Sequence, residues 1–560
     1  MFQETVRSFL IHFALIALVA TVLFAPAVLT GMPIGHSYYP NHAWTLSFAE
    51  ALSWSNPYPR WLPGTWAGSG SPDFYFYPPL FFYVAALAQN TCCAHPDQAI
   101  AITGWLFHVA SGIGVWMLAR SLGLGSLGRL AAAIAILLLP YHLNVFFARS
   151  ALGEVALFAA LGFLLSGFSD MLARGRGGVR IVLGSAAIIL SHILSVPLAA
   201  MGCFAIVFAY RKELELRRVL AAAALGCLGA LTTAIYWLPA LLLRDTVASD
   251  ILLLMPWANN LLLWGTIVSR KFLPEVYLPA LALTPCALAA CWIWRKEAGR
   301  AATFSAVTLA AAWFMMTPIS KALWLHTPLP ILQFPWRFMV VVDFGFALAA
   351  GFAAEQLRRN WSGLAAVKRR VLRAGAVVLV VIVGVGQPAW YASNADAVPA
   401  DRAIQMRIAV LEWLSWNGRP LGFGYPGRMV DMDLSPPLDR DAAVSTDTVG
   451  AAVELISEEP REIVFRVDAE SDAVVLLRRG FWEFWVLERL DDGMTVSLDA
   501  TDPHPLITAT LPAGEGTWRL RLEMPWAEKL GIAVSAAAIV AVLVTLLLVG
   551  REALVGRRRS

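Results

Sequence analysis

The chain has 560 residues, of which 58% are hydrophobic and 15% are charged. An ordinary soluble protein has roughly 25% charged residues, so this composition excludes a soluble globular chain. The apolar residues come in blocks of about 20, the length that a helix needs to cross a hydrocarbon core of ~30 Å. The formal net charge of +4 says little about partners by itself. Because the chain is built of membrane-length apolar blocks, we expect membrane lipids as partners and no nucleic acid.

Basic loops orient these apolar blocks. Lys and Arg next to membrane spans mark the cytoplasmic side, and such residues recur between the blocks and in the C-terminal tail. Block 9–29, which follows Arg7, is interpreted as an uncleaved first helix because it is too long for a signal peptide and lacks a convincing cleavage site. If every basic loop is cytoplasmic, both termini are cytoplasmic and an even number of crossings separates successive basic loops.

This parity predicts one long outer loop near the N-terminus. Three apolar blocks lie between Arg7 and Arg120, so only two of them can cross. The middle block, 77–89, has about 13 residues and is typical of a re-entrant or interfacial segment. Residues 30–98 are therefore predicted to lie outside as a single loop.

Parity also predicts a hairpin. A single apolar stretch of about 30 residues lies between Arg180 and Arg211, and it must go out and return. We expect it to turn near His192 and Pro197. Irregular backbone at that depth is tolerated only where it is buried in protein or lines a wet cavity. His192 then lies near the outer mouth of an internal cleft, unless the turn is a simple surface loop.

The remaining apolar blocks complete a polytopic α-helical membrane protein of about twelve transmembrane helices. Besides the first loop, three outer connections are substantial, at 243–276, 320–336 and 391–528. The other predicted spans are 130–146, 154–171, 219–242, 277–294, 302–319, 337–356, 373–390 and 529–549.

The last outer connection has the composition of a separate domain. Its short runs alternate apolar and polar residues with period two, separated by Asp-Asp-Gly, Asp-Pro and Gly-Glu-Gly turns. This pattern predicts a small antiparallel β-sandwich over about 452–524. We divide the chain into a multi-spanning domain (1–390), an extracytoplasmic linker and β-sandwich domain (391–528), and a final helix with a basic cytoplasmic tail (529–560).

The first outer loop is the most unusual segment. It is crowded with Trp, Tyr, Pro and Gly, and it carries His36, Arg60 and Asp73. Aromatic belts anchor many membrane proteins at the interface, which is the simpler interpretation. A belt does not need so many Gly and Pro, or polar residues folded back against the bilayer, so we favour a shaped pocket at the membrane surface.

Two other outer segments carry charged residues. Arg149 and Glu154 stand at the start of a span, where the helix dipole alone favours a carboxylate. Arg337 lies at the outer edge of another span, with Asp343 about 9 Å further along the same helix. Six residues apart, these two fall on different faces, so we expect Asp343, a costly residue inside a span, to pair with another helix.

Metal sites and soluble-enzyme motifs are not indicated. The six cysteines are scattered, and only the vicinal pair Cys92–Cys93 lies in a polar loop, so neither a disulfide framework nor zinc-ligand spacing is present. The sequence also lacks a phosphate-binding Gly-rich loop, a nucleophile elbow and a His-Glu-x-x-His motif. No metal ligand is assigned, and a requirement for a divalent cation is left open.

A set of motifs resembles a known family. The runs NPYPRW and GSGSPDFYFYPPL, then ARSALGE, LSH and FPWRF in that order, resemble bacterial membrane proteins with a 6-pyruvoyl-tetrahydropterin synthase-related membrane domain. The resemblance covers roughly residues 30–350. It does not imply pterin chemistry, because the histidine pattern of that zinc enzyme is absent. It implies membership of the GT-C glycosyltransferase superfamily, whose multi-spanning enzymes take sugars from polyprenyl-phosphate donors on the extracytoplasmic face.

By this resemblance the site needs a base for the acceptor hydroxyl and cations for the departing phosphate. GT-C enzymes typically place an acidic base early in the first outer loop, but this sequence has Gly35-His36-Ser37 there and no carboxylate before Glu50. Either one of the catalytic candidates serves as base, or transfer has been lost. The catalytic candidates are His36, Asp73 and Glu154. The candidates for substrate binding are Arg60, Arg149, His192 and Arg337, although each arginine could equally be an interfacial snorkelling residue.

The sequence thus predicts an inverting glycosyltransferase of the bacterial inner membrane. It would move a sugar from a polyprenyl-phosphate-linked donor to an extracytoplasmic lipid or glycan acceptor. Two alternatives stay open: a non-catalytic protein that binds or transports lipid-linked glycans, and a scaffold for envelope assembly that uses its β domain for contacts. Transporters tend to show internal repeats with matched broken helices, and we find one broken hairpin and no repeat.

Overall fold

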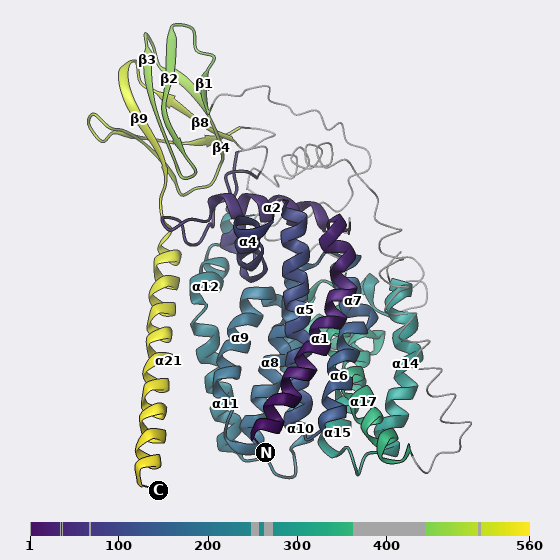
Figure 1. Cartoon of the computed structure of the whole chain (residues 1–560). Helices are drawn as coiled ribbons and strands as arrows, with labels where there is room; N and C mark the ends of the chain where they lie inside the picture. Colours follow the sequence, from purple (N-terminus) through teal and green to yellow (C-terminus); the bar gives the residue numbers. More distant parts are fainter. Residues whose placement is uncertain are drawn as a thin grey trace.

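The computed structural model describes residues 2–33, 35, 37–65, 69–93, 95–247, 257–262, 273–361, 443–501 and 506–559. Within these residues the protein is a bundle of apolar helices with a β domain at one end (Figure 1). Both chain termini lie at the end of the bundle opposite the β domain. Helix α21 (Trp526–Arg559) runs along the outside of the bundle and connects the β domain to that far end.

Seven of the described helices are long and apolar enough to cross a membrane. Three bent helix pairs raise the number of candidate spans in the described residues to ten. The predicted span 373–390 lies outside the described residues. The seven candidates are α1 (Phe2–Thr30), α5 (Pro96–Ser121), α8 (Leu152–Arg174), the run Gly178–Ala209, α14 (Leu273–Ile293), α17 (Met339–Arg359) and α21.

Two blocks predicted as single spans, 130–146 and 219–242, are broken helices, and a third pair bends at the end of the predicted span 302–319. Their bends are 41°, 74° and 76°. Pro140 and Pro318 stand at two of the breaks, where they cannot donate a helical hydrogen bond. The third break contains no proline. The pairs are α6 (Ser126–Leu138) with α7 (Pro140–Phe147), α11 (Leu216–Leu231) with α12 (Ala234–Leu242), and α15 (Gly299–Met316) with α16 (Lys321–His326).

The run Gly178–Ala209 counts as one candidate span by length and composition. Its contacts show that the chain turns within it. Gly184 packs against Leu164 of α8, and Gly202 packs against the next residue, Leu165. Both halves therefore lie at the same level of α8, as the predicted hairpin requires. The halves are α9 (Gly178–His192) and α10 (Val196–Ala209), joined by the short turn η2 (Ile193–Ser195).

The first outer loop contains helices. Helix α2 (Tyr38–Ala51) lies across the β-domain end of the bundle (Figure 1). Helix α4 (Leu80–Cys92) is apolar but too short for a span, as predicted for block 77–89. The single-turn helix α3 (Asp73–Phe76) lies between them in the chain.

Helices α5 and α8 touch through glycine. A Cβ atom on Gly114 would lie 3.0 Å from the Cα atom of Gly162, and a Cβ on Gly162 would lie 2.9 Å from the Cα of Gly114. Small residues at such positions let the backbones of membrane helices approach closely. Gly114 and Gly162 therefore bring α5 and α8 into direct backbone contact.

The β domain consists of two antiparallel sheets, with strand orders β1-β4-β8-β7 and β2-β3-β9-β5-β6. Val475 and Ile507 from one sheet and Phe465 and Trp518 from the other share one buried cluster. The described strands begin at residue 444, earlier than the predicted 452. They are β1 (Val444–Thr446), β2 (Ala451–Glu459), β3 (Glu462–Ala469), β4 (Ala473–Gly480), β5 (Trp485–Arg489), β6 (Thr495–Val496), β7 (Asp499–Ala500), β8 (Leu506–Leu511) and β9 (Gly514–Leu522).

The β domain rests on the first outer loop. The buried Trp61 ring stacks on Trp482 with ring centroids 6.3 Å apart and meets Trp485 edge-on at 5.2 Å. The Gly480 amide donates to the Ser69 carbonyl oxygen at 2.8 Å. The first loop therefore lies between the β domain and the helix bundle, where it can shape a site at their junction.

Candidate functional site

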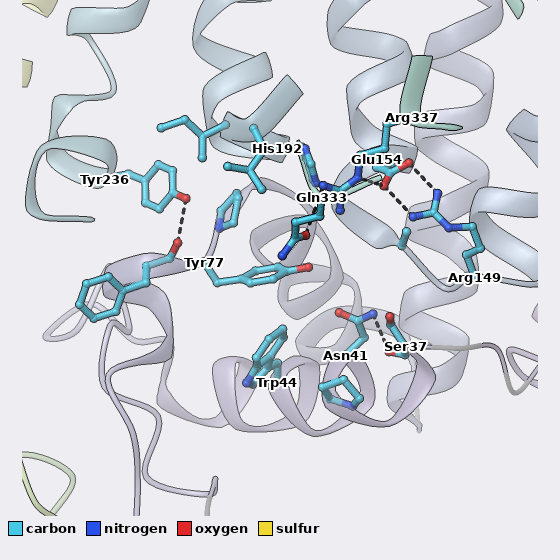
Figure 2. A pocket seen from close by; sticks show the side chains of 17 residues that line it. Ser37, Asn41, Trp44, Tyr77, Arg149, Glu154, His192, Tyr236, Gln333 and Arg337 are labelled. Carbon is cyan, nitrogen blue, oxygen red and sulfur yellow. Dashed lines mark hydrogen bonds and ion pairs between the residues drawn. The ribbon is translucent and has the colours of Figure 1, made fainter. Parts of the chain in front are cut away.

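A cavity of about 120 Å³ lies between the first outer loop and the adjacent ends of several helices (Figure 2). A single water molecule needs only ~10–15 Å³ by the same measure, so the cavity can hold a small chemical group. Its described lining is Ser37, Pro40, Asn41, Trp44, Phe76, Tyr77, Pro78, Arg149, Ala151, Gly153, Glu154, His192, Ile193, Leu194, Tyr236, Gln333 and Arg337.

Two arginines and one glutamate meet in this cavity (Figure 2). The Arg149 guanidinium donates in a fork to Glu154, with Nη1–Oε2 at 2.7 Å and Nη2–Oε1 at 2.9 Å. The Arg337 Nε donates to Glu154 Oε1 at 3.0 Å. The Tyr141 hydroxyl donates to Oε2 at 3.0 Å. Both carboxylate oxygens are therefore engaged, and Glu154 holds the two guanidinium groups side by side.

The local backbone geometry positions these side chains in the cavity. Glu154 stands in the first turn of α8, and Arg337 belongs to the short turn η8 (Pro335–Phe338) that precedes α17. Ser150 and Gln333 are the two non-glycine residues with positive φ among the described residues, at 50° and 62°. One follows Arg149 directly and the other lines the cavity. Backbone strain of this kind gathers at functional sites, where surrounding contacts hold it in place.

Among the described residues that line the cavity, the charges do not cancel. Arg149, Glu154 and Arg337 are all buried, and together they carry one excess positive charge. Arg337 Nη1 also donates to the Leu332 carbonyl oxygen at 2.6 Å, which fixes its orientation. Arginine forks match the geometry of phosphate and carboxylate oxygens. The arrangement can therefore accept an anionic group from the cavity side.

Aromatic rings form another wall. The Trp44 and Tyr77 ring centroids are 4.5 Å apart. Tyr236 of α12 donates its hydroxyl to the Phe76 carbonyl oxygen at 3.0 Å, which ties α12 to α3 (Figure 2). A cavity with apolar rings and a few convergent polar groups is typical of a ligand site.

Helix α2 is fastened to the arginine turn. Asn41 Nδ2 donates to the carbonyl oxygens of Ser37 at 2.7 Å and Ser150 at 2.6 Å. The Ser37 amide donates to the Arg149 carbonyl oxygen at 3.0 Å. The first loop thereby closes one side of the cavity.

The structure brings four predicted site residues together. Arg149, Glu154, His192 and Arg337 all line the cavity. His192 Nδ1 lies 2.8 Å from the Ser195 hydroxyl, at the turn of the hairpin. His36 lies outside the described residues.

Asp73 lies in the first loop but does not line this cavity. Its carboxylate is buried and accepts a hydrogen bond from the Ser71 hydroxyl. Burial raises the pKa of Asp73 to about 7, although hydrogen bonds with Ser71, Trp44 and Thr65 oppose the rise. Asp73 is thus buried behind the cavity wall, next to Trp44, and titrates near neutrality.

Arg60 is also placed elsewhere. Its Nε atom pairs with Glu528 Oε1 at 3.1 Å, its Nη2 donates to the Ile235 carbonyl oxygen at 2.7 Å, and its guanidinium lies 4.1 Å from the centroid of the Tyr58 ring. The charge of Arg60 is therefore matched by the first turn of α21. This arrangement favours a structural role over the predicted phosphate contact.

Asp343 pairs with another helix, as predicted. Its Oδ2 atom accepts a hydrogen bond from the backbone amide of His142 at 3.1 Å. His142 lies in the first turn of α7, directly after the Pro140 break. A carboxylate there meets a helix N-terminus, where unpaired amides and the helix dipole favour it.

Sequence reasoning did not single out several residues of the site. Tyr141, Asn41, Gln333 and Tyr236 line the cavity or bond to residues that do, but no chemical signal in the sequence distinguishes them from their neighbours. The motif LQFPWRF contains Gln333 but gave no reason to prefer it over its neighbours. Within the described ranges, no group of three or more His, Cys, Asp or Glu side chains could hold a metal ion.

Comparison with known proteins yields structural likeness only. No protein-family model and no curated protein matches the chain. The chain is similar to crystal structures of the Archaeoglobus fulgidus oligosaccharyltransferase, in the apo form (14% identity, TM-score 0.43) and with Zn and sulfate (14%, 0.41). It is also similar to AglB of that organism in complex with an inhibitory peptide and a dolichol-phosphate (13%, 0.43). The matches cover 72% of this chain and 55–57% of those chains, so it spans little more than half their length. This likeness is too weak to carry an argument about activity.

Proposed function

We propose that the protein is a membrane glycosyltransferase of the GT-C type, which takes a sugar from a polyprenyl-phosphate-linked donor at the described cavity. The observation that carries this proposal is the pair of buried arginines, Arg149 and Arg337, which share one carboxylate and retain an excess positive charge. Such a pair suits a sugar-linked phosphate, and the neighbouring rings of Trp44, Tyr77 and Tyr236 suit the sugar and the first apolar groups of the lipid.

The proposed reaction is an inverting displacement. The acceptor hydroxyl oxygen attacks the anomeric carbon, the bond from that carbon to the phosphate oxygen breaks, and the polyprenyl phosphate leaves with the electron pair. Arg149 and Arg337 stabilise the charge that grows on the phosphate. The acceptor proton passes to a carboxylate, and no strong general acid is needed because phosphate is a good leaving group.

Glu154 is our candidate for that carboxylate. In the described state its two oxygens accept the Arg149 fork and one hydrogen bond from Arg337 Nε. A donor phosphate that takes over these hydrogen bonds would release Glu154 toward the cavity. Binding of the donor would then produce the base, which links binding to proton transfer. Asp73 remains the second candidate, but it lies behind the cavity wall next to Trp44, so a role as base requires that wall to open.

The engaged state of Glu154 also favours a second function. If no donor displaces Glu154 from the arginines, the cavity has no free base, because Glu154 is the one carboxylate in the described lining. The protein would then bind a lipid-linked glycan without catalysis. Under either reading the acceptor, or the bound glycan, lies on the extracytoplasmic side of a bacterial inner membrane, with both termini in the cytoplasm. A divalent cation is not assigned a role.

Incubation of purified protein with a polyprenyl-phosphate sugar radiolabelled in the sugar, together with an extract of bacterial envelope lipids and glycans as acceptor, tests the proposal. Transfer should release unlabelled polyprenyl phosphate, and Arg337→Lys should lower the rate at least tenfold, because lysine cannot form the fork. The matched control is Arg244→Gln, an exposed arginine of the short turn η3 (Arg244–Thr246) that does not line the cavity. Binding of the labelled donor without its turnover would support the binding protein instead. Absence of both binding and turnover would contradict both functions.

A further inference from the structure

The break between α11 and α12 contains no proline and bends by 74°. In a membrane, the backbone groups that such a break frees must find other partners. Ser535 of α21 provides one: its hydroxyl accepts a hydrogen bond from the Ile235 amide at 2.7 Å and lies 3.4 Å from the Leu231 carbonyl oxygen. A single side chain of α21 therefore contacts both sides of the break.

Helix α21 approaches α12 closely at the same level. A Cβ atom on Gly531 would lie 2.7 Å from the Ala234 carbonyl oxygen and 3.0 Å from Pro239 Cδ. Any side chain at Gly531 would therefore push the two helices apart. Figure 1 shows α12 and α21 side by side along the edge of the bundle.

A buried ion pair also contacts the backbone at this break. Glu528 in the first turn of α21 pairs with Arg60 at 3.1 Å, and the same guanidinium donates to the Ile235 carbonyl oxygen at 2.7 Å. The Tyr75 hydroxyl donates to Glu528 Oε2 at 2.6 Å. Ile235 is thus held at its amide by α21 and at its carbonyl by Arg60.

The residue after Ile235 is Tyr236, which lines the cavity and is fully buried. We propose that α21 stabilises the bent conformation of the α11/α12 span. Through this contact, Ser535, Gly531 and the Arg60–Glu528 pair position Tyr236 in the cavity. These are positioning residues, because none of them lines the cavity itself. The consequence for ligand affinity rests on the proposed function; the positioning of Tyr236 does not.

The position of Tyr236 can be measured without a ligand. With 3-fluorotyrosine at position 236 of the full-length protein in detergent, Ser535→Ala should shift or split the ¹⁹F resonance, because the Ile235 amide loses its acceptor. The matched control is Thr545→Val, which removes another α21 hydroxyl that bonds only within its own helix, to the Ala541 carbonyl oxygen. An unchanged resonance in Ser535→Ala would overturn the proposal.

A glycine pair provides a second test that does not depend on a hydrogen bond. Gly531→Ala should shift the same resonance. Gly226→Ala in α11 should not, because a Cβ there would meet only the Ser185 hydroxyl at 3.5 Å. If Gly531→Ala prevents folding, Ser535→Ala still decides the question.

Binding then separates the two proposals. With a polyprenyl phosphate as probe, Ser535→Ala should weaken binding about threefold to tenfold, the value of one hydrogen bond that orders a site, while Thr545→Val binds like the wild type. If Ser535→Ala shifts the resonance but the wild type does not bind the probe, the positioning role of α21 is supported and the proposed function is contradicted. If the wild type binds the probe and the resonance is unshifted in both Ser535→Ala and Gly531→Ala, the proposed function is supported and the positioning role of α21 is contradicted.

Discussion

Glu154 occupies the position between Arg149 and Arg337 that an anionic ligand would also prefer. Its four hydrogen bonds come from the two guanidinium groups and from Tyr141. Because these groups are buried, each interaction is stronger than it would be in water. The residue therefore both organises the arginines and competes with the ligand for them.

Glu154→Gln separates these two effects. The amide keeps the shape but removes the competing charge, so a polyprenyl phosphate should bind several-fold more tightly. If Glu154 takes the acceptor proton, single-turnover transfer should fall by about 10²–10⁴-fold. Equilibrium binding and single-turnover rates measure the two quantities, with Glu50→Gln in the first loop as control. Weaker binding together with a nearly unchanged rate would show that Glu154 only positions the arginines.

The raised pKa of Asp73 predicts a pH dependence of stability. Its pKa is about 7 in the folded protein and near 3.8 when exposed, so between these values the folded state binds a proton that the unfolded state does not. Stability from this residue is therefore present below about pH 4 and is lost as the pH rises through 7, by about 1.4 kcal/mol per pH unit at most.

Asp73→Asn should remove this dependence. Thermal unfolding in detergent should show the variant more stable relative to the wild type at pH 8 than at pH 5. The exposed Asp468→Asn in the β domain serves as control and should leave the difference between the two pH values unchanged. An Asp73→Asn variant with the same pH profile as the wild type would contradict the prediction.

The members of the site were easier to predict than their arrangement. Their location at the outer ends of spans, within the motifs ARSALGE and FPWRF, drew attention to Arg149, Glu154 and Arg337 from the sequence. Their convergence depends on the positive φ of Ser150 and on a turn before α17 that is distant in the chain. Arg60 gave the same signal but pairs with Glu528, because a snorkelling, a ligand-binding and an ion-paired arginine look alike in sequence.

At the scale of elements, the breaks in the helices decide where polar groups face the site. The break before α7 brings Tyr141 to Glu154 and exposes the first amides of α7. Asp343 of α17 accepts one of these amides, from His142. The α6/α7 break is therefore stabilised by a partner from another helix.

Asp343→Leu should destabilise this break. It leaves the buried His142 amide without its acceptor, at a cost of about 1–3 kcal/mol. Asp343→Asn retains an oxygen acceptor and should lose distinctly less. Denaturant titration of both variants in mixed micelles measures the difference. Equal losses would mean that the negative charge of Asp343 matters and the hydrogen bond does not.

Some of these breaks could be predicted from sequence and one could not. Pro140 and Pro318 are visible breaking signals inside blocks of apolar residues. The α11/α12 break has no proline at Thr232 and Thr233, and part of its freed backbone is bonded by Ser535, some 300 positions further along the chain. The period-two alternation of the β domain, by contrast, is local and was readable directly.

At the scale of the whole molecule, the β domain, first loop and α21 are joined by polar contacts that are buried or partly buried. Arg60 meets Glu528, and Arg461 of the β domain donates to the Tyr75 hydroxyl at 3.1 Å. The Trp482 indole donates to the Thr246 hydroxyl at 3.0 Å. The β domain is therefore fixed on the first outer loop.

Arg60→Ala should destabilise the folded protein by about 3–5 kcal/mol, because it leaves Glu528 buried without its cation. The double variant Arg60→Met, Glu528→Leu should lose less, since no charge remains unpaired. Urea unfolding of the detergent-solubilised protein, followed by tryptophan fluorescence, compares them. A double variant less stable than Arg60→Ala would contradict a role for the charge pair.

The contact between Gly114 and Gly162 limits how the molecule can admit a large lipid. Two backbones that already touch cannot slide past or tilt against one another without a clash. Helices α5 and α8 therefore behave as one rigid unit, and Glu154 belongs to it. Room for an incoming ligand must then come from the opposite wall, where Tyr236 follows a helix break and Ile193 begins the turn of the hairpin. A methyl group at Gly114 or Gly162 would push α5 and α8 apart. It would thereby misalign the arginines without touching the lining of the cavity.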